Sequence, residues 1–184
     1  MTQALTHRQF SVHDYARMRD THILAEDERI ELLDGEVYSM SPIGPFHVGI
    51  VNKLNRLLMM QIGSLAIVSV QNPVQLKDYS EPQPDIAILS LRDDYYVEAL
   101  ARPEDILLII EVADSSLDYD RDEKLPRYAQ AHISEVWIVD VSRHIVEQYT
   151  EPLQSEYRQL RKVMPGETIT ATLVPIRLTT SDLF

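Results

Sequence analysis

Two carboxylates stand where an ionised side chain is unfavourable unless something compensates its charge. Asp85 follows Pro84 and opens the apolar segment DIAILS, and Glu111 directly follows the four apolar residues at 107–110. Burying an ionised carboxylate without a partner is costly, so Glu111 needs a cation nearby. If the two segments are neighbouring strands, their carboxylates lie at one level, where they repel each other and favour a bound divalent cation. This pattern predicts a metal site built from Asp85 and Glu111.

A lysine downstream could bring a positive charge to the same place. Asp120, Lys124 and Tyr128 follow one another at intervals of four residues, so they share one face of a helix predicted over 120–131. A helix packed back on the sheet could carry the Lys124 ammonium to the metal. Two alternatives stay open: a solvent-exposed Asp120–Lys124 pair worth about 0.3–0.5 kcal/mol, or a structural Glu111–Lys124 pair without metal.

The elements that must position these residues follow from turn signals and periodicity. Ser11 with Asp14 resembles a capping box that starts a short helix, and Asp34-Gly35 suits a type I′ turn between two short strands. Apolar residues at helical spacing predict a helix over 46–62. Further strands are expected at 65–70 with a continuation over 73–78, and at 85–90, 107–112, 135–141, 144–150 and 156–163. This order predicts one domain over 1–184, of class α/β or α+β, with helices on the faces of a mixed sheet.

These segments, in this order, resemble the Uma2 family of restriction endonucleases within the PD-(D/E)xK nuclease superfamily. The resemblance rests on PQPD at 82–85, LLIIEVADSS at 107–116, DxxxKxxxY at 120–128 and EVWIVDV at 135–141. IELLDGEVYSMSP followed by His47 resembles the amino-terminal half of the family, and PIRLTTSDLF resembles its carboxyl terminus. The resemblance implies a restriction-endonuclease-like core, a mixed β-sheet flanked by helices, here extended by a β-meander.

The resemblance also implies roles for individual residues. Asp85 and Glu111 match the two metal-binding carboxylates, and the backbone carbonyl of Val112 would complete the protein ligands of Mg²⁺, or of Mn²⁺ in its place. The superfamily has a lysine two positions after the Glu, where this chain has Ala113. Lys124 matches a lysine that has migrated to the following helix. Two further polar positions of the family are matched here, and both are expected near the site: Glu31 and His47.

The implied activity is Mg²⁺-dependent hydrolysis of DNA phosphodiester bonds, with Lys124 orienting the attacking water or stabilising charge on the phosphoryl oxygens. A homodimer is a family-level expectation, because cutting both strands of a duplex needs two sites. Against DNA binding stands a formal net charge of −12, from 17 Lys plus Arg and 29 Asp plus Glu. A locally basic face could offset it, with these residues as candidates: Lys53, Arg56, Arg121, Lys124, Arg127, Arg158, Arg161 and Lys162.

Two other functions stay open, and several are excluded. The chain could be a catalytically inactive nuclease-fold protein with a binding or regulatory role, or a metal-dependent hydrolase of another phosphoester. With no Cys, thiolate metal sites and disulfides are impossible, and the five Gly form neither a phosphate-binding loop nor a GxSxG elbow. MTQALTHRQF has no apolar h-region, and no segment reaches the roughly 20 apolar residues of a membrane span, so a cytoplasmic protein is expected.

Overall fold

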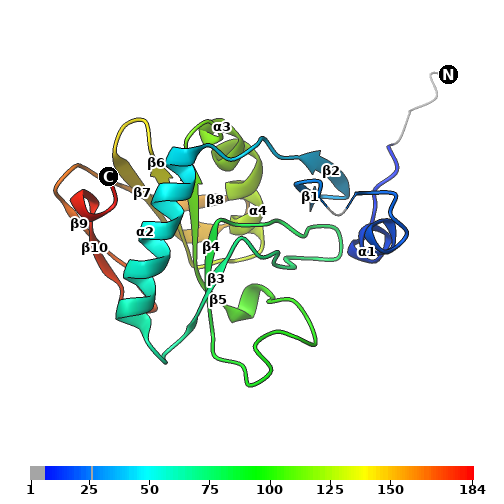
Figure 1. Ribbon diagram of the computed structural model, residues 1–184, viewed down its shortest axis with the longest axis horizontal. Coiled ribbons are helices and arrows are strands. Elements are labelled where there is room, and N and C mark those ends of the chain that lie inside the picture. Colours follow the sequence, from blue (N-terminus) through cyan, green and yellow to red (C-terminus); the bar gives the residue numbers. More distant parts are fainter. Residues whose placement is uncertain (1–6, 26) are drawn as a thin grey trace.

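The central feature of the computed structural model, which describes residues 7–25 and 27–184, is a six-stranded mixed sheet of order β3-β4-β5-β6-β7-β8 (Figure 1). Strands β5 and β6 are parallel, and every other neighbouring pair in this sheet is antiparallel. The predicted α/β class with a mixed sheet and a closing β-meander is confirmed. The strands are β3 Ile67–Val70, β4 Ile86–Leu89, β5 Ile106–Ala113, β6 Glu135–Asp140, β7 Ile145–Leu153 and β8 Glu156–Val163.

Helices cover both faces of this sheet. Helix α2 (Pro45–Ile62) buries its apolar face against one side, together with the hairpin of β9 (Thr168–Thr170) and β10 (Arg177–Thr179). A helical segment covers the other side; it consists of α3 (Leu117–Tyr119), η2 (Asp120–Lys124) and α4 (Leu125–Gln130). Because side chains alternate along a strand, Leu108 and Ile110 of β5 face α2, whereas Ile109 and Glu111 face α4. The strand is buried on both sides, as its apolar sequence predicts.

The amino-terminal elements lie beside the sheet, at the end of the molecule away from β9 and β10 (Figure 1). Helix α1 (Val12–Asp20) starts at the capping box of Ser11 and Asp14, as predicted. Strands β1 (Ile30–Leu33) and β2 (Glu36–Ser39) form a hairpin whose turn residues both have positive φ, 48° at Asp34 and 83° at Gly35. The Asp-Gly dipeptide therefore forms the expected I′-type turn.

The structure corrects two expectations about the elements and adds one hairpin. The helix predicted over 120–131 begins earlier, at Leu117, and contains a π turn in which the N–H of Leu125 reaches the carbonyl of Asp120. The strand expected over 73–78 is absent from this described segment, because Gln71 adopts a φ of +52° that ends the extended chain. The sequence analysis also missed the hairpin of β9 and β10, whose three-residue strands are too short to give a periodic signal.

Two short 3-10 turns complete the described elements. They are η1 (Pro103–Asp105), which leads into β5, and η3 (Thr180–Asp182), which follows β10. In the described part of the chain, none of the helices combines the length and the apolar character needed to cross a membrane.

Candidate active site

Asp85 and Glu111 meet because β4 and β5 are antiparallel neighbours. Ile86, the first residue of β4, lies opposite Ile110 of β5. Asp85, which precedes Ile86, and Glu111, which follows Ile110, therefore come together. The N–H of Asp85 donates to Glu111 Oε2 at 3.3 Å. The N–H of Val112 donates to Asp85 Oδ2 at 2.9 Å. The predicted juxtaposition of the two carboxylates is therefore present, and each of them is held by backbone of the other strand.

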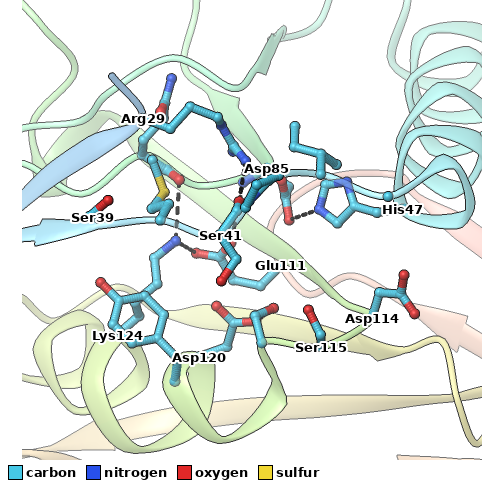
Figure 2. A pocket seen from close by; sticks show the side chains of 17 residues that line it. Arg29, Ser39, Ser41, His47, Asp85, Glu111, Asp114, Ser115, Asp120 and Lys124 are labelled. Carbon is cyan, nitrogen blue, oxygen red and sulfur yellow. Dashed lines mark hydrogen bonds and ion pairs between the residues drawn. The ribbon is translucent and has the colours of Figure 1, made fainter. Parts of the chain in front are cut away.

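Lys124 reaches the same place from the π turn. Its Nζ lies 2.8 Å from Glu111 Oε1 and donates to the carbonyl of Gln83 at 3.2 Å (Figure 2). Only 3% of Lys124 is exposed, so the alternative of a solvent-exposed pair with Asp120 is excluded. One turn further on, the hydroxyl of Tyr128 donates to Glu111 Oε1 at 2.6 Å. The face predicted for Asp120, Lys124 and Tyr128 is thus the face that meets the carboxylates.

Glu31 also lies at the site, because the first hairpin is fixed to the segment that precedes β4. Leu32 and Glu81 form an isolated antiparallel bridge, which brings the neighbouring Glu31 under the N–H of Gln83, 2.9 Å from Oε2. Glu31 Oε2 lies 3.7 Å from Lys124 Nζ. The Tyr119 hydroxyl donates to Glu31 Oε1 at 2.5 Å. Glu31 is therefore a second acidic neighbour of the buried ammonium.

His47 comes from the first turn of α2 and lies on the other side of Asp85. Its Nε2 is hydrogen-bonded to Asp85 Oδ2 at 2.9 Å (Figure 2). Its Nδ1 is buried and has no hydrogen-bond partner among the described residues. Both polar positions that the resemblance placed near the site thus contact it: His47 bonds to the metal-ligand candidate Asp85, and Glu31 lies next to the cationic group of Lys124.

The buried charges shift one another's pKa values. Burial raises the pKa of Glu111 to about 8, and the carboxylates of Asp120 and Asp85 add to this effect, while Lys124 opposes it. Burial likewise raises the pKa of Asp120 to about 6. Burial would lower the pKa of Lys124, but Glu111 and its acidic neighbours outweigh it and hold that pKa well above the ordinary value. At Asp85 burial is outweighed by His47 and Lys124, so its pKa is lowered. Lys124 is therefore a cation, and the acidic side chains around it together retain a proton near neutral pH.

These residues line a cavity of about 250 Å³. One wall carries Arg29 and the segment that follows β2, and the opposite wall carries Asp114, Ser115 and Asp120 (Figure 2). The sequence analysis did not assign Arg29 to the site, because the residue directly precedes the segment at 30–42 that resembles the family. The remaining lining residues are Ser39, Met40, Ser41, Pro42, Ile43, Gly44, His47, Gln83, Asp85, Glu111, Ser116, Tyr119 and Lys124.

The donor set fits a small hard cation with few protein ligands. Within residues 7–25 and 27–184, no three His, Asp or Glu side chains are arranged to hold a metal. Among the described residues, Asp85 and Glu111 each keep one weakly engaged oxygen: Asp85 Oδ1 accepts from Gln71 Nε2 at 3.3 Å, and Glu111 Oε2 accepts the 3.3 Å bond from the N–H of Asp85. The N–H of Val112 points to Asp85, and because the N–H and C=O of one strand residue point to the same side, the Val112 carbonyl lies on the edge of β5 next to β4. Two carboxylates and a carbonyl, with water and phosphate oxygens, are typical of Mg²⁺.

The basic residues proposed from the sequence do not converge on one face. They are distributed over α2, the segment 117–130 and β8, and most of them are engaged within the protein. Arg121 and Lys162 both pair with Glu147, at 2.7 and 3.3 Å. Arg127 pairs with carboxylates at 2.9 Å. The helices that carry these candidates cover opposite faces of the sheet, and the paired side chains are partly neutralised within the protein.

Comparisons with known proteins show the family of the chain and its fold class. A family model named Uma2, with the description "Putative restriction endonuclease", matches residues 12–181. The crystal structure of "a putative nuclease belonging to DUF820 from Anabaena variabilis ATCC 29413" is similar with a TM-score of 0.72 and 12% sequence identity, over 95% of this chain and 97% of that chain. No curated protein matches the sequence. At this identity the structural likeness shows the fold alone, and it confirms the expected nuclease-like fold class.

Proposed function

Because the chain belongs to the Uma2 family, we propose that it is a Mg²⁺-dependent DNA endonuclease that hydrolyses phosphodiester bonds. The observation that carries the proposal is the meeting of Asp85, Glu111 and Lys124, which come from three separate segments, at the wall of one cavity. Two carboxylates next to a buried ammonium, on a fold of the nuclease type, suit the hydrolysis of an anionic phosphodiester.

Asp85, Glu111 and the Val112 carbonyl would hold Mg²⁺, with Mn²⁺ as an alternative ion. When bound, the ion supplies a Lewis acid that polarises a phosphoryl oxygen and lowers the pKa of a water ligand. The protein's own part is to fix the ligands. His47 and the N–H of Val112 both bond to Asp85 Oδ2, which orients the carboxylate so that Oδ1 faces away from them. His47 is therefore a positioning residue for the metal ligand.

Lys124 would act as the cationic group of the reaction. Its ammonium has three N–H donors, of which Glu111 and the Gln83 carbonyl occupy two. The third can orient the attacking water or bond to a phosphoryl oxygen. Glu31, 3.7 Å away, and the rigid π turn keep the ammonium in place. Since the raised pKa keeps Lys124 charged, it serves as an electrostatic stabiliser and not as a general base.

The test is cleavage of supercoiled plasmid DNA with Mg²⁺, with Mn²⁺ and with EDTA. We expect nicked or linear product with either metal and none with EDTA. Lys124→Met should reduce the cleavage rate by about 10²- to 10³-fold, because one stabilising donor is lost, while Mg²⁺ affinity measured by calorimetry changes little. Lys162→Met is the matched control and should cleave like the wild type, since Lys162 is about half exposed and pairs with Glu147 on the meander. Unchanged cleavage by Lys124→Met, assayed well below its melting temperature, would refute the role of the migrated lysine.

A second function has a specific observation in its favour. Glu111 is already satisfied by Lys124 and Tyr128, so the pair can exist as a structural bridge without metal. This arrangement suits a nuclease-fold protein with a binding or regulatory role. Retention on DNA at low salt, without cleavage by any of the divalent metals, would favour that function. The proposed homodimer, which would supply two sites for a duplex, can be measured by sedimentation.

A further inference from the structure

Arg29 differs from the other half-buried arginines of the described chain. Each of the others forms an ion pair with a carboxylate: Arg92 with Asp94, Arg121 with Glu147, and Arg127 with Asp34 and Glu123. Arg29 forms no ion pair with any described residue, although it is only partly exposed to solvent. Partial burial of a guanidinium without a counter-charge is unfavourable, so this arginine is suited to an anion supplied from outside the protein.

The position of Arg29 is fixed by the hairpin. Its backbone carbonyl accepts from the N–H of Met40 at 2.7 Å, and its Nη1 donates to the carbonyl of Ser41 at 2.9 Å. A guanidinium has five N–H donors, so this single bond orients the group and leaves four donors. Figure 2 shows the side chain on the cavity wall opposite Asp114 and Asp120. Arg29 is thus a pre-positioned donor on the wall of the cavity, and it forms no ion pair with the cavity's carboxylates.

We propose that Arg29 binds a phosphate of the DNA strand that enters this cavity. The cavity is lined by the carboxylates of Asp85, Glu111, Asp114 and Asp120, which by themselves repel DNA. Lys124 uses two of its three donors on Glu111 and the Gln83 carbonyl, whereas Arg29 keeps most of its donors for a second phosphate contact. Its planar fork matches the two non-bridging oxygens of a phosphodiester. The choice of DNA as the ligand rests on the proposed function. A single well-placed arginine explains how an acidic protein could hold DNA without a broad basic face.

The experiment compares three substitutions of Arg29 in the full chain. Arg29→Ala removes the group, Arg29→Lys keeps the charge, and Arg29→Gln keeps an N–H donor for Ser41 without the charge. Arg158→Ala, an exposed arginine on the edge strand β8, is the control for net charge. The readouts are the Kd for a labelled DNA duplex with Ca²⁺ as the oxygen-bound cation, the dependence of that Kd on salt, KM and kcat for Mg²⁺-dependent cleavage, and the melting temperature.

We expect Arg29→Ala and Arg29→Gln to raise the Kd and KM by about 10- to 100-fold, as for loss of a charged hydrogen bond, with kcat and melting temperature nearly unchanged. Arg29→Lys should recover part of the affinity. The slope of log K against log[salt] should fall by about 0.9, the value for one phosphate contact on duplex DNA. Arg158→Ala should change the Kd less than twofold.

Three results would overturn the inference. The first is equal DNA affinity of Arg29→Ala and the wild type. The second is a loss of DNA affinity and a lower melting temperature in Arg29→Ala and Arg29→Lys, with both values normal in Arg29→Gln. This result would show that Arg29 only fixes the hairpin through Ser41. The third is a wild type that is not retained on DNA at low salt. Failure of the proposed catalysis is distinguishable, because it would leave Arg29-dependent DNA binding without any cleavage.

Discussion

Replacing Lys124 with methionine should destabilise the metal-free protein by about 3–5 kcal/mol at pH 9. The ammonium lies 2.8 Å from Glu111 and 3.7 Å from Glu31, and the side chain is 3% exposed. Methionine has a similar volume, so the substitution removes the charge and little of the packing. Removing one partner of a buried ion pair costs about 3–5 kcal/mol, because the remaining charge is left uncompensated. For a chain of this length, that corresponds to a fall in melting temperature of about 6–20 °C.

The same loss should be smaller at pH 5. Glu111 has its pKa raised to about 8 and Asp120 to about 6, so at pH 5 both carboxyl groups are protonated in the folded protein. Lys124 then has fewer negative neighbours, and its removal leaves less uncompensated charge. Lys124 is itself charged at both pH values. Because its pKa in the folded protein is raised, its stabilising contribution is fully present below the ordinary lysine pKa of about 10.4.

The assay is urea denaturation with EDTA present, at pH 9 and pH 5. Lys162→Met is the control, because it removes the same charge from a half-exposed pair 3.3 Å from Glu147 and should cost less than about 1 kcal/mol. Adding Glu111→Gln to Lys124→Met should restore most of the stability at pH 9, since the unpaired carboxylate is then neutral. A loss no larger than that of Lys162→Met, or an equal loss at the two pH values, would refute the reasoning that Lys124 is the compensating charge of this site.

The remaining predictions concern the titration of Glu111 and the backbone at two glycines. The apparent Mg²⁺ affinity should rise about tenfold per pH unit from pH 6 to 8 and then level off, because Glu111 must lose its proton to bind; calorimetry in two buffers would show the released proton, and equal affinities at pH 6 and 9 would contradict the assignment. Over the same pH range the metal-free protein should lose stability. The pKa of Glu111 is about 8 in the folded protein and near 4.5 in the unfolded chain, so its stabilising contribution is fully present below pH 4.5 and is lost as the pH rises through 8. Gly35→Ala should destabilise by about 1–3 kcal/mol, because φ is +83° and the new Cβ would lie 2.5 Å from Gln9 Cβ. Gly49→Ala, in α2 with nothing within 4 Å, should stabilise by about 0.5–1 kcal/mol, so thermal melts that shift in the same direction for both would contradict this account.

The sequence by itself determined the elements whose signals are local. The 3.6-residue spacing of apolar side chains identified α2, the uninterrupted apolar run identified β5 as a strand covered on both faces, and Asp34-Gly35 identified the hairpin turn. The sequence also indicated that Glu111 needs a cation. Its carboxylate follows four apolar residues of a buried strand and is itself buried, and a buried ionised carboxylate is unfavourable without a partner. The four-residue spacing placed Lys124 and Tyr128 on one helical face, and that face does meet Glu111.

The tertiary structure decided what depends on contacts between distant segments. The pairing of β4 with β5 set the distance between Asp85 and Glu111, and the bridge between Leu32 and Glu81 brought Glu31 to Lys124. No local pattern shows that Arg29 has no carboxylate partner among residues 7–25 and 27–184, since that depends on the side chains packed around it. The π turn and the left-handed Gln71 likewise arise from long-range contacts, because such backbone conformations persist only where the surrounding structure stabilises them.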